Sequence, residues 1–379
     1  MEDLFKYTHI VFGSEHYNPL GIIRSLGENG IKPVGVFFKS KRKIASSSKY
    51  LSKIHYVNNK EEGLQIILDN YVKNSSLKPF VYTADDKLTS FLDSQYDSLN
   101  DKIYFYNAGK ANRVTEFMNK KTILEIAKRH GLNVIDSITL NKNCIGNVEE
   151  KKLDNLIYPV LTKAISPTKT NWKGDSIVCQ TKEELKQALA MIQSEEILIQ
   201  HFINKKNEYV VDGISVAKGK QVLYAIASTY NYVLQNFYSF DMNITNCNKK
   251  DITEKLDAVF AEIGFEGICE IEFLVDQDET LYFSEINFRN STWSYASTCV
   301  GMNLPLLWAE STLLGELPPN ALKKIPENYR AIQELSDFKR RVLSCKENIF
   351  SWLKKVRKAQ CLYVYNKKDP RPFWAYFYL

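Results

Sequence analysis

The strongest chemical signal in the sequence is a set of polar side chains on two strand-like segments close to position 280. Glu270 and Glu272 alternate along the first segment, and Glu285, Asn287 and Arg289 alternate along the second. Side chains two residues apart in a strand point to the same face, so Glu272, Glu285 and Asn287 converge if the two strands pair. Carboxylate and amide oxygens are the hard ligands that Mg2+ prefers, and this cation commonly binds substrate phosphates as well. The alternative is a pair of solvent-facing acidic residues on an edge hairpin.

The remaining residue types argue against several other chemistries. The seven cysteines are scattered and include no Cys-x-x-Cys pair, which argues against a disulfide framework and a structural zinc site. None of the five histidines lies after position 201, so chemistry in the C-terminal half must use carboxylates, amides and cations. The first predicted strand is not followed by the Gly-x-Gly-x-x-Gly dinucleotide fingerprint, and the sequence contains no P-loop. Neither an NAD site nor a P-loop nucleotide site is therefore indicated.

The elements that must position these side chains form more than one folded region. With 379 residues, 44% of them apolar and 25% charged, the chain suffices for two or three globular domains. Residues 8–38 alternate strand, helix and strand, which predicts a mostly parallel α/β sheet, whereas residues 132–290 have a mixed α+β pattern. Further strands are expected at 54–57, 80–82, 103–106, 158–165, 176–179, 197–200, 208–217, 221–229, 268–275 and 281–286, and helices at 61–72, 116–130, 182–193 (capped by Thr181) and 252–263.

Several of these segments, in their order along the chain, resemble the ATP-grasp superfamily. Glu272, followed on the next strand by Glu285-Ile-Asn287-Phe-Arg289, is similar to the metal-binding signature of that superfamily, whose ligases activate a carboxylate as an acylphosphate. Lys163 in the stretch Tyr-Pro-Val-Leu-Thr-Lys is similar to its ATP-binding lysine. The resemblance covers residues 5–315 and is greatest to D-aspartate ligase and its relatives. It implies a Rossmann-like pre-ATP-grasp domain at 1–112, the ATP-grasp region at 113–318 and a C-terminal extension at 319–379. Within the ATP-grasp region, the lid is expected at about 132–198 and the metal-binding part at about 199–318.

The resemblance also implies roles for individual residues. The residues that it assigns to nucleotide binding are Lys120, Lys163, Lys173, Gln200, His201, Phe202, Ile203, Glu208, Glu272 and Glu285. Lys173 would lie in the loop that covers the phosphates, and residues 200–203 in the strand whose backbone pairs with adenine. Glu208 would contact the ribose. Glu272, Glu285 and Asn287 are the implied metal ligands, and Arg289 and Lys163 the implied catalytic cations. For Arg289, a structural ion pair with one of the glutamates is the alternative to holding the γ-phosphate or acylphosphate.

The expected function is an ATP-dependent ligase that uses ATP and Mg2+. It would join an amino-acid carboxylate to an amine and release ADP and phosphate, with a role in modifying cell-envelope or polysaccharide precursors. An ATP-grasp kinase and a non-catalytic ATP-binding protein are the alternatives. We expect substrate choice to depend on loops at the cleft expected in the α/β unit, namely those around Asn18, at 83–86 and at 290–297. Asp85 and Asp86 equally fit a helix N-cap.

The C-terminal segment differs from the rest of the chain in its charge. Residues 321–379 contain 14 Lys or Arg against 5 Asp or Glu. Within them, residues 339–358 read as one helix with Ile349, Leu353 and Val356 on one side, which fits either a lipid or lipid-linked phosphate surface or packing against the body. No recognisable motif indicates a nucleic-acid partner. Because neither a signal peptide nor an apolar run of about 18 residues is present, we expect a cytoplasmic protein, and we allow for a homodimer.

Overall fold

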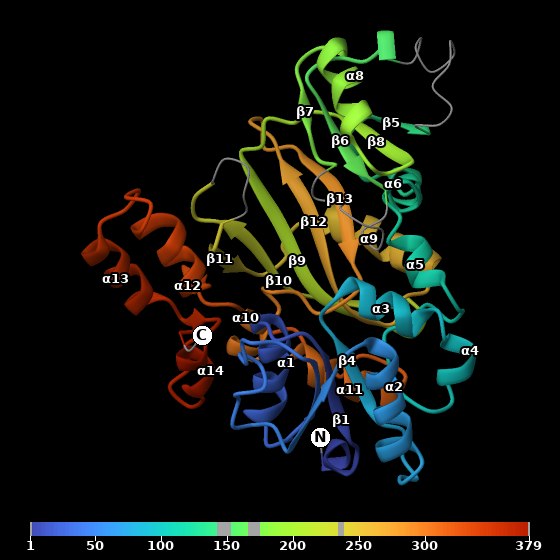
Figure 1. Ribbon diagram of the computed structural model, residues 1–379, viewed down its shortest axis with the longest axis vertical. Coiled ribbons are helices and arrows are strands. Elements are labelled where there is room, and N and C mark those ends of the chain that lie inside the picture. The colour runs from blue at the N-terminus through green and yellow to red at the C-terminus, as the bar shows by residue number, and fades with distance from the viewer. Residues whose placement is uncertain (1, 142–152, 166–174, 234–238, 378–379) are drawn as a thin grey trace.

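The first sheet lies in the N-terminal part of the chain. The computed structural model describes residues 2–141, 153–165, 175–233 and 239–377 (Figure 1). Four parallel strands are arranged in the order β3-β2-β1-β4: β1 (His9–Gly13), β2 (Val34–Phe38), β3 (Lys53–Val57) and β4 (Phe80–Thr83). The helical segments of this region are η1 (Glu2–Lys6), α1 (Tyr17–Gly27), α2 (Lys60–Ile67), η2 (Leu68–Val72), α3 (Asp86–Asp93) and α4 (Tyr96–Leu99). All five residues of β1 are buried, as expected for a central strand in a parallel sheet with helices on its faces.

Two expectations for the N-terminal part need correction. Residues 103–106 form no strand, since Tyr104 makes only an isolated bridge to Phe80. The helix expected over 116–130 is divided into α5 (Arg113–Phe117) and α6 (Lys120–Arg129). The division arises because the Asn119 side chain accepts hydrogen bonds from the backbone N–H groups of Lys121 and Thr122 and so starts a new helix. The new start places Lys120 in the first turn of α6.

A second, smaller sheet forms the upper part of the molecule in Figure 1. Its strands, in the order β5-β8-β6-β7, are β5 (Ser137–Asn141), β6 (Val160–Ala164), β7 (Val178–Cys179) and β8 (Glu196–His201), all antiparallel to their neighbours. One helix, α8 (Lys182–Met191), packs its buried side against this sheet. The predicted cap is confirmed, because Oγ1 of Thr181 accepts a hydrogen bond from the backbone N–H of Glu184 at 3.2 Å.

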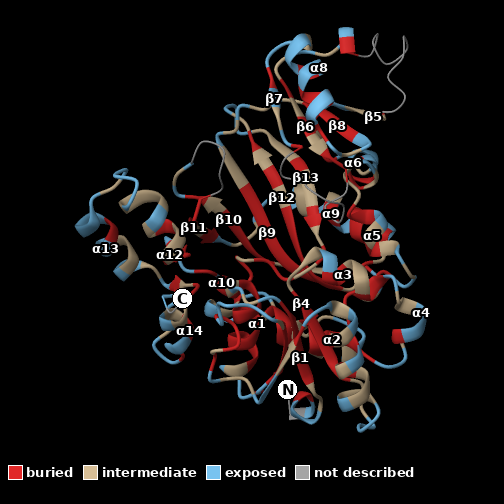
Figure 2. Cartoon of the chain, in the orientation of Figure 1, coloured by how far each residue is buried: buried red, intermediate tan, exposed pale blue. Residues whose placement is uncertain are grey.

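The largest sheet carries the predicted acidic strands. Its order is β13-β12-β9-β10-β11-β14-β15: β9 (Asn207–Val216), β10 (Gln221–Tyr230), β11 (Asp241–Thr245), β12 (Gly267–Val275), β13 (Leu281–Asn287), β14 (Tyr329–Ile332) and β15 (Cys361–Leu362). Only the β14–β15 pair is parallel among these described strands. The helices of this region are α9 (Lys250–Ile263), α10 (Tyr295–Cys299) and α11 (Leu304–Leu314). Buried residues follow the strands of this sheet and of the N-terminal sheet, which places the main core between the sheets and their helices (Figure 2).

The C-terminal extension is attached to this sheet by β14 and β15. Its helical segments are α12 (Glu334–Asp337), η4 (Phe338–Val342), α13 (Ile349–Lys358) and α14 (Arg371–Ala375). The single helix predicted over 339–358 is therefore wrong. The chain leaves the helix after η4, and Cys345 has a φ of 56°, a left-handed conformation that no α-helix tolerates. No helix in the described part of the chain has the length and apolar character needed to cross a bilayer.

Candidate active site

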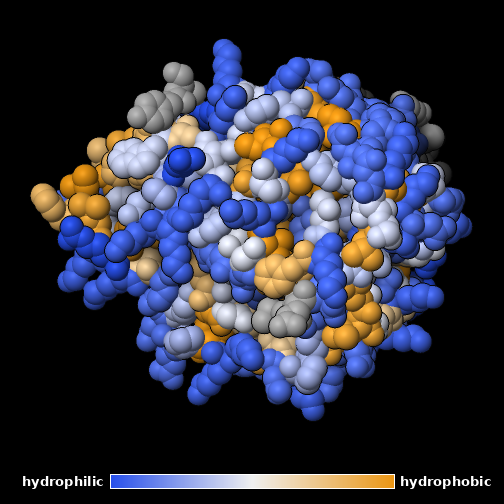
Figure 3. All heavy atoms as spheres, turned by 90° about the horizontal axis from the view of Figure 1, so that it is seen from below, coloured by the Kyte–Doolittle hydropathy of each residue, from blue (hydrophilic) through white to orange (hydrophobic). Residues whose placement is uncertain are grey.

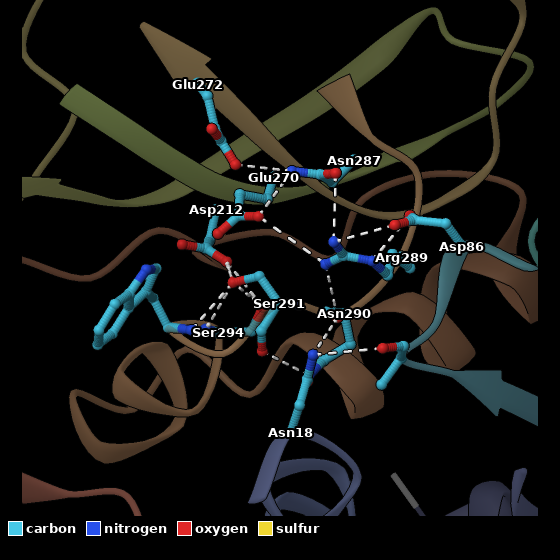
Figure 4. Close-up of polar contacts among 12 residues, drawn as sticks. Asn18, Asp86, Asp212, Glu270, Glu272, Asn287, Arg289, Asn290, Ser291 and Ser294 are labelled. Atoms are coloured by element: carbon cyan, nitrogen blue, oxygen red, sulfur yellow. Dashed lines mark hydrogen bonds and ion pairs between the residues drawn. The ribbon is translucent and has the colours of Figure 1, made fainter. Parts of the chain in front are cut away.

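A polar cavity of about 540 Å³ lies where the N-terminal sheet meets β12 and β13. The large sheet contributes acidic and amide side chains, and α6 contributes Lys120. His16 comes from the loop after β1, and Asn18 and Asp86 come from the first turns of α1 and α3. Figure 4 shows Asn18, Asp86 and the acidic and amide side chains of the large sheet pointing toward one another from separate elements. The cavity is therefore built from segments distant in the sequence.

The expected convergence of the two acidic strands is present. In the antiparallel β12–β13 pair, Glu272 lies opposite Glu285, and Glu270 lies opposite Asn287. The Asn287 amide nitrogen Nδ2 donates to Oε2 of Glu270 at 2.9 Å and to Oε1 of Glu272 at 2.8 Å. Although β13 is the edge strand of its sheet, Glu272, Glu285 and Asn287 all line the cavity.

Burial and mutual repulsion make these carboxylates weak acids. Burial, together with the charges of Glu270 and Glu208, raises the pKa of Glu272 to about 8. Burial and the nearby carboxylate of Asp212 raise the pKa of Glu270 to about 7. Raised pKa values of this kind mean that the cluster holds more negative charge than its protein partners neutralise.

The cluster has a cationic neighbour, Lys120, whose ammonium group forms an ion pair with Glu285. Burial and the nearby charge of Lys163 lower the pKa of Lys120 to about 7. Burial also lowers the pKa of Lys163, although the carboxylates of Glu272 and Glu208 act in the opposite direction. Two lysines and a carboxylate cluster therefore share one partly dehydrated region, a setting in which an anionic ligand and a cation can both be held.

The predicted metal ligands fit Mg2+ by their chemistry. Among the described residues, no group of three or more His, Cys, Asp or Glu is already arranged to hold a metal ion. Instead, Glu285 is paired with Lys120 and Glu272 accepts from Asn287. The surplus negative charge that raises the pKa of Glu272 is nevertheless what a divalent cation would compensate. The assignment of Glu272, Glu285 and Asn287 as ligands remains a prediction.

Arg289 has a partner that the sequence did not single out. Its Nε lies 2.8 Å from Oδ1 of Asp86, and one terminal nitrogen lies 3.3 Å from Oδ2 of the same carboxylate. That terminal nitrogen also donates to Oδ1 of Asn287 at 3.2 Å, whereas Glu270 is 3.9 Å from the other terminal nitrogen. The main ion pair is thus with Asp86, not with a glutamate. Neighbouring Asp85 is the N-cap of α3, so the two aspartates have different roles.

A residue that was not recognised from the sequence is Asp212, a fully buried carboxylate on β9. It lies opposite Glu270 in the β9–β12 pair. Its Oδ1 accepts from the hydroxyls of Ser291 and Ser294 at 2.6 and 2.7 Å, and its Oδ2 has no hydrogen-bond partner in the described part of the chain. Burial raises its pKa to about 6. The available signal was an acidic residue inside the otherwise apolar stretch Val-Val-Asp-Gly-Ile-Ser-Val.

Of the other predicted nucleotide-binding residues that the structure describes, Lys163 and Gln200 lie in the smaller sheet, and Glu208 lies on β9 of the largest sheet. Glu208 lines the cavity, accepts from the Tyr230 hydroxyl and pairs with Lys205. Gln200 is buried in β8, and residues 201–203 follow it. Neither they nor Lys163 line the cavity, and Lys173 lies outside the described residues. The nucleotide-binding roles of all these residues stay predictions.

The loops expected to choose the substrate meet at one end of the cavity. Asn18 and Asn290 exchange hydrogen bonds: Nδ2 of Asn18 donates to the Asn290 carbonyl at 3.0 Å, and Nδ2 of Asn290 donates to Oδ1 of Asn18 at 2.7 Å. This contact joins the start of α1 to the segment that follows β13 (Figure 4). Asp86, held by Arg289, lines the same cavity. The three predicted loops are therefore neighbours in space.

Comparison with known proteins agrees with this geometry. Residues 125–294 match the ATP-grasp domain family. This segment is similar to ATP-grasp domains. This match and the solved structures described below confirm the predicted ATP-grasp fold.

One curated relative and two solved structures illustrate the range of ATP-grasp proteins similar to this chain. D-alanine–D-alanine ligase from Neisseria meningitidis serogroup B is 31% identical over 123 residues, which span 30% of this chain and 38% of that ligase. An L-amino acid ligase from Bacillus licheniformis has a TM-score of 0.60 at 15% identity and covers 83% of this chain and 78% of its own. The biotin carboxylase domain dimer of 2-oxoglutarate carboxylase from Hydrogenobacter thermophilus, solved with MgADP, has a TM-score of 0.65 at 17% identity. The alignment covers 86% of this chain and 73% of the carboxylase chain. At these identities the two structures show the shared fold alone.

Proposed function

We propose that this protein is an ATP-dependent ligase that joins an amino-acid carboxylate to an amine. The observation that carries the proposal is the arrangement of Glu272, Glu285 and Asn287 on paired strands, with Arg289 beside them. A rigid sheet holds these groups in one geometry, which is what a reaction governed by alignment requires. Similarity to D-alanine–D-alanine ligase and to an L-amino acid ligase supports the choice of reaction.

The proposed reaction has two steps. A carboxylate oxygen of the first substrate attacks the γ-phosphorus of ATP, the bond to the β-phosphate oxygen breaks, and ADP leaves. The amine nitrogen of the second substrate then attacks the acyl carbon, and phosphate leaves with one oxygen of the original carboxylate. Bound Mg2+ would neutralise phosphate charge, and Glu272, Glu285 and Asn287 would hold it.

The chain's own cations bind and orient the reacting groups. Arg289 presents a planar fork suited to the oxyanions of a phosphoryl group or a carboxylate. Its orientation is set by Asp86, which holds one edge of the guanidinium. Lys120 and Lys163 contribute positive charge at the other side of the carboxylate cluster. Little covalent work falls to the protein, and charge stabilisation does most of the catalysis.

We further propose the substrate class from the resemblance to D-aspartate ligase. An amino acid would occupy the end of the cavity where Asn18, Asp86 and Asn290 meet, and the amine would belong to a cell-envelope or polysaccharide precursor. Such a reaction uses cytoplasmic ATP, so we place the protein there. A homodimer is compatible with this proposal.

The test is a screen of ADP release over D- and L-amino acids, each paired with simple amines, followed by an isotope experiment. With 18O in the substrate carboxylate, the ligase transfers one labelled oxygen to the released phosphate. A kinase acting on a hydroxyl retains its phosphoryl group and gives no labelled phosphate, and a non-catalytic ATP-binding protein releases no ADP. Either of these two results would overturn the proposal.

A further inference from the structure

Helix α13 projects from the body of the protein and exposes apolar side chains. It lies at the far left in Figure 1, beyond α12. None of its residues lines the cavity. Phe350 is 77% exposed, Ile349 43% and Leu353 37%. Viewed from below, an apolar patch with a hydrophilic border occupies the same left edge (Figure 3). An aromatic ring this exposed on a helix that is otherwise strongly cationic needs an explanation beyond core packing.

Trp352 anchors α13 to the body of the protein. It is not one of the apolar residues, Ile349, Leu353 and Val356, that the sequence offered for packing against the body. Its indole nitrogen donates to Oδ2 of Asp337 at 2.7 Å, and its ring packs edge-on against Phe338 at 5.0 Å between centroids. Because Trp352 faces the body, Phe350 and Leu353 face outward. Packing against the body therefore accounts for only one side of the helix.

The outward side of α13 carries cations without acidic partners. Phe350, Leu353, Lys354, Arg357 and Lys358 line one shallow hollow, and we call these five residues the α13 face. None of its three cations forms an ion pair within the described part of the chain. Positive charge and apolar surface thus coincide on the α13 face.

The acidic residues of this region are turned inward. Glu347, the only acidic residue in 338–358, has a side chain that is 7% exposed and is paired with Arg341 and Lys355. Asp337 and Asp369 are fully buried. The fold therefore converts a mixed sequence into a surface whose exposed charge is positive.

We propose that the α13 face docks on the surface of an anionic lipid bilayer. The helix would lie in the plane of the interface, with Phe350 and Leu353 among the acyl-chain boundaries and the three cations at headgroup level. A folded protein partner would need both an acidic surface and a pocket shaped to Phe350. A bilayer accommodates the cations and the phenyl ring without shape complementarity. Docking would hold the ligase beside a membrane while its cavity, on another part of the molecule, stays accessible.

The experiment measures co-sedimentation of the full chain with vesicles. We expect it to bind vesicles of phosphatidylcholine containing about 30% phosphatidylglycerol, to bind pure phosphatidylcholine at least tenfold more weakly, and to dissociate as ionic strength rises. The variant K354E/R357E/K358E should bind about 100-fold more weakly, since each cation contributes roughly fivefold. The variant F350S/L353S should also lose at least about tenfold, because the apolar insertion is removed.

Matched controls separate docking from general charge effects and from loss of folding. K32E/K102E/K110E makes the same charge change at three exposed lysines of the N-terminal region and should keep most of the vesicle binding. All variants should keep the same ADP release in solution, since none of these residues lines the cavity. The proposal is overturned if the unmodified chain does not bind anionic vesicles, if the control loses as much binding as K354E/R357E/K358E, or if F350S/L353S binds as well as the unmodified chain.

Discussion

Nε of Arg24 lies 3.2 Å from Oδ2 of Asp369, and both side chains are fully buried although 345 residues separate them. Arg24 also donates to the backbone carbonyls of Tyr363 and Val364, at 3.1 and 2.8 Å. Asp369 accepts in addition from the Ser48 hydroxyl at 2.8 Å. This network ties α1 to the segment that follows β15, so the C-terminal extension is part of the folded body.

Removing one partner of this ion pair leaves the other charge buried without compensation. We therefore expect Asp369→Ala to lower the free energy of unfolding by about 3–5 kcal/mol. Urea denaturation followed by circular dichroism would measure this. Asp101→Ala, at an exposed site, is the matched control and should change stability by less than about 0.5 kcal/mol. A loss below about 1 kcal/mol for Asp369→Ala would show that the pair does not hold the extension in place.

Substituting Glu272 should separate catalysis from stability. Glu272→Gln removes a predicted metal ligand, so we expect ADP release to fall by about 100-fold or more. Stability should stay unchanged or rise, because the variant removes a carboxylate whose pKa burial and repulsion raise to about 8. Glu279→Gln, in the exposed turn between β12 and β13, is the control and should keep activity within about twofold. Full activity in Glu272→Gln would refute the proposed role of this glutamate.

The fork of Arg289 should matter more than its charge. Arg289→Lys keeps the charge but cannot contact both oxygens of Asp86 as the guanidinium does. We expect kcat/KM to fall by about 10- to 100-fold, with the fold retained. Arg129→Lys, at a more exposed ion pair with Glu262, is the control for the same exchange. If Arg289→Lys were as active as the unmodified enzyme, a positive charge alone would suffice at this position.

His9 should make stability depend on pH in the acid range. It is buried and contacts the Tyr82 hydroxyl at 2.8 Å, and burial lowers its pKa from 6.5 to about 4. Between pH 6.5 and 4 the unfolded chain binds a proton that the folded chain does not, so stability falls as pH decreases through this window. At pH 5 the loss from this group is about 2 kcal/mol relative to pH 8.

The measurement is urea denaturation of His9→Gln at pH 5 and pH 8. Glutamine cannot be protonated in this range, so the difference in the free energy of unfolding between the two pH values should shrink by about 2 kcal/mol. His201→Gln, at a partly exposed histidine, is the matched control. An equally large pH dependence in His9→Gln would show that other groups cause the acid lability.

Elements with a strong local pattern were predictable from the sequence. The alternation along 268–275 and 281–286 predicted two paired strands, and the pairing indeed brings Glu272 opposite Glu285. Thr181 was recognised as a cap, because its hydrogen bond joins residues three apart. Failures occurred where local pattern and tertiary context disagree. In 339–358 the composition favours a helix throughout, but the chain turns at Cys345 so that Trp352 can reach Asp337.

Taken alone, the sequence determined many of the strands and helices, the acidic strand pair and the excess of positive charge at the C-terminus, because each depends on neighbouring residues. Only the tertiary structure decided that Asp86 holds Arg289, that Asp212 lies opposite Glu270 and that Arg24 binds Asp369. These contacts join residues far apart in the chain, so no local periodicity encodes them. They form because burying a charge is costly unless an opposite charge or a hydrogen-bond donor is buried with it.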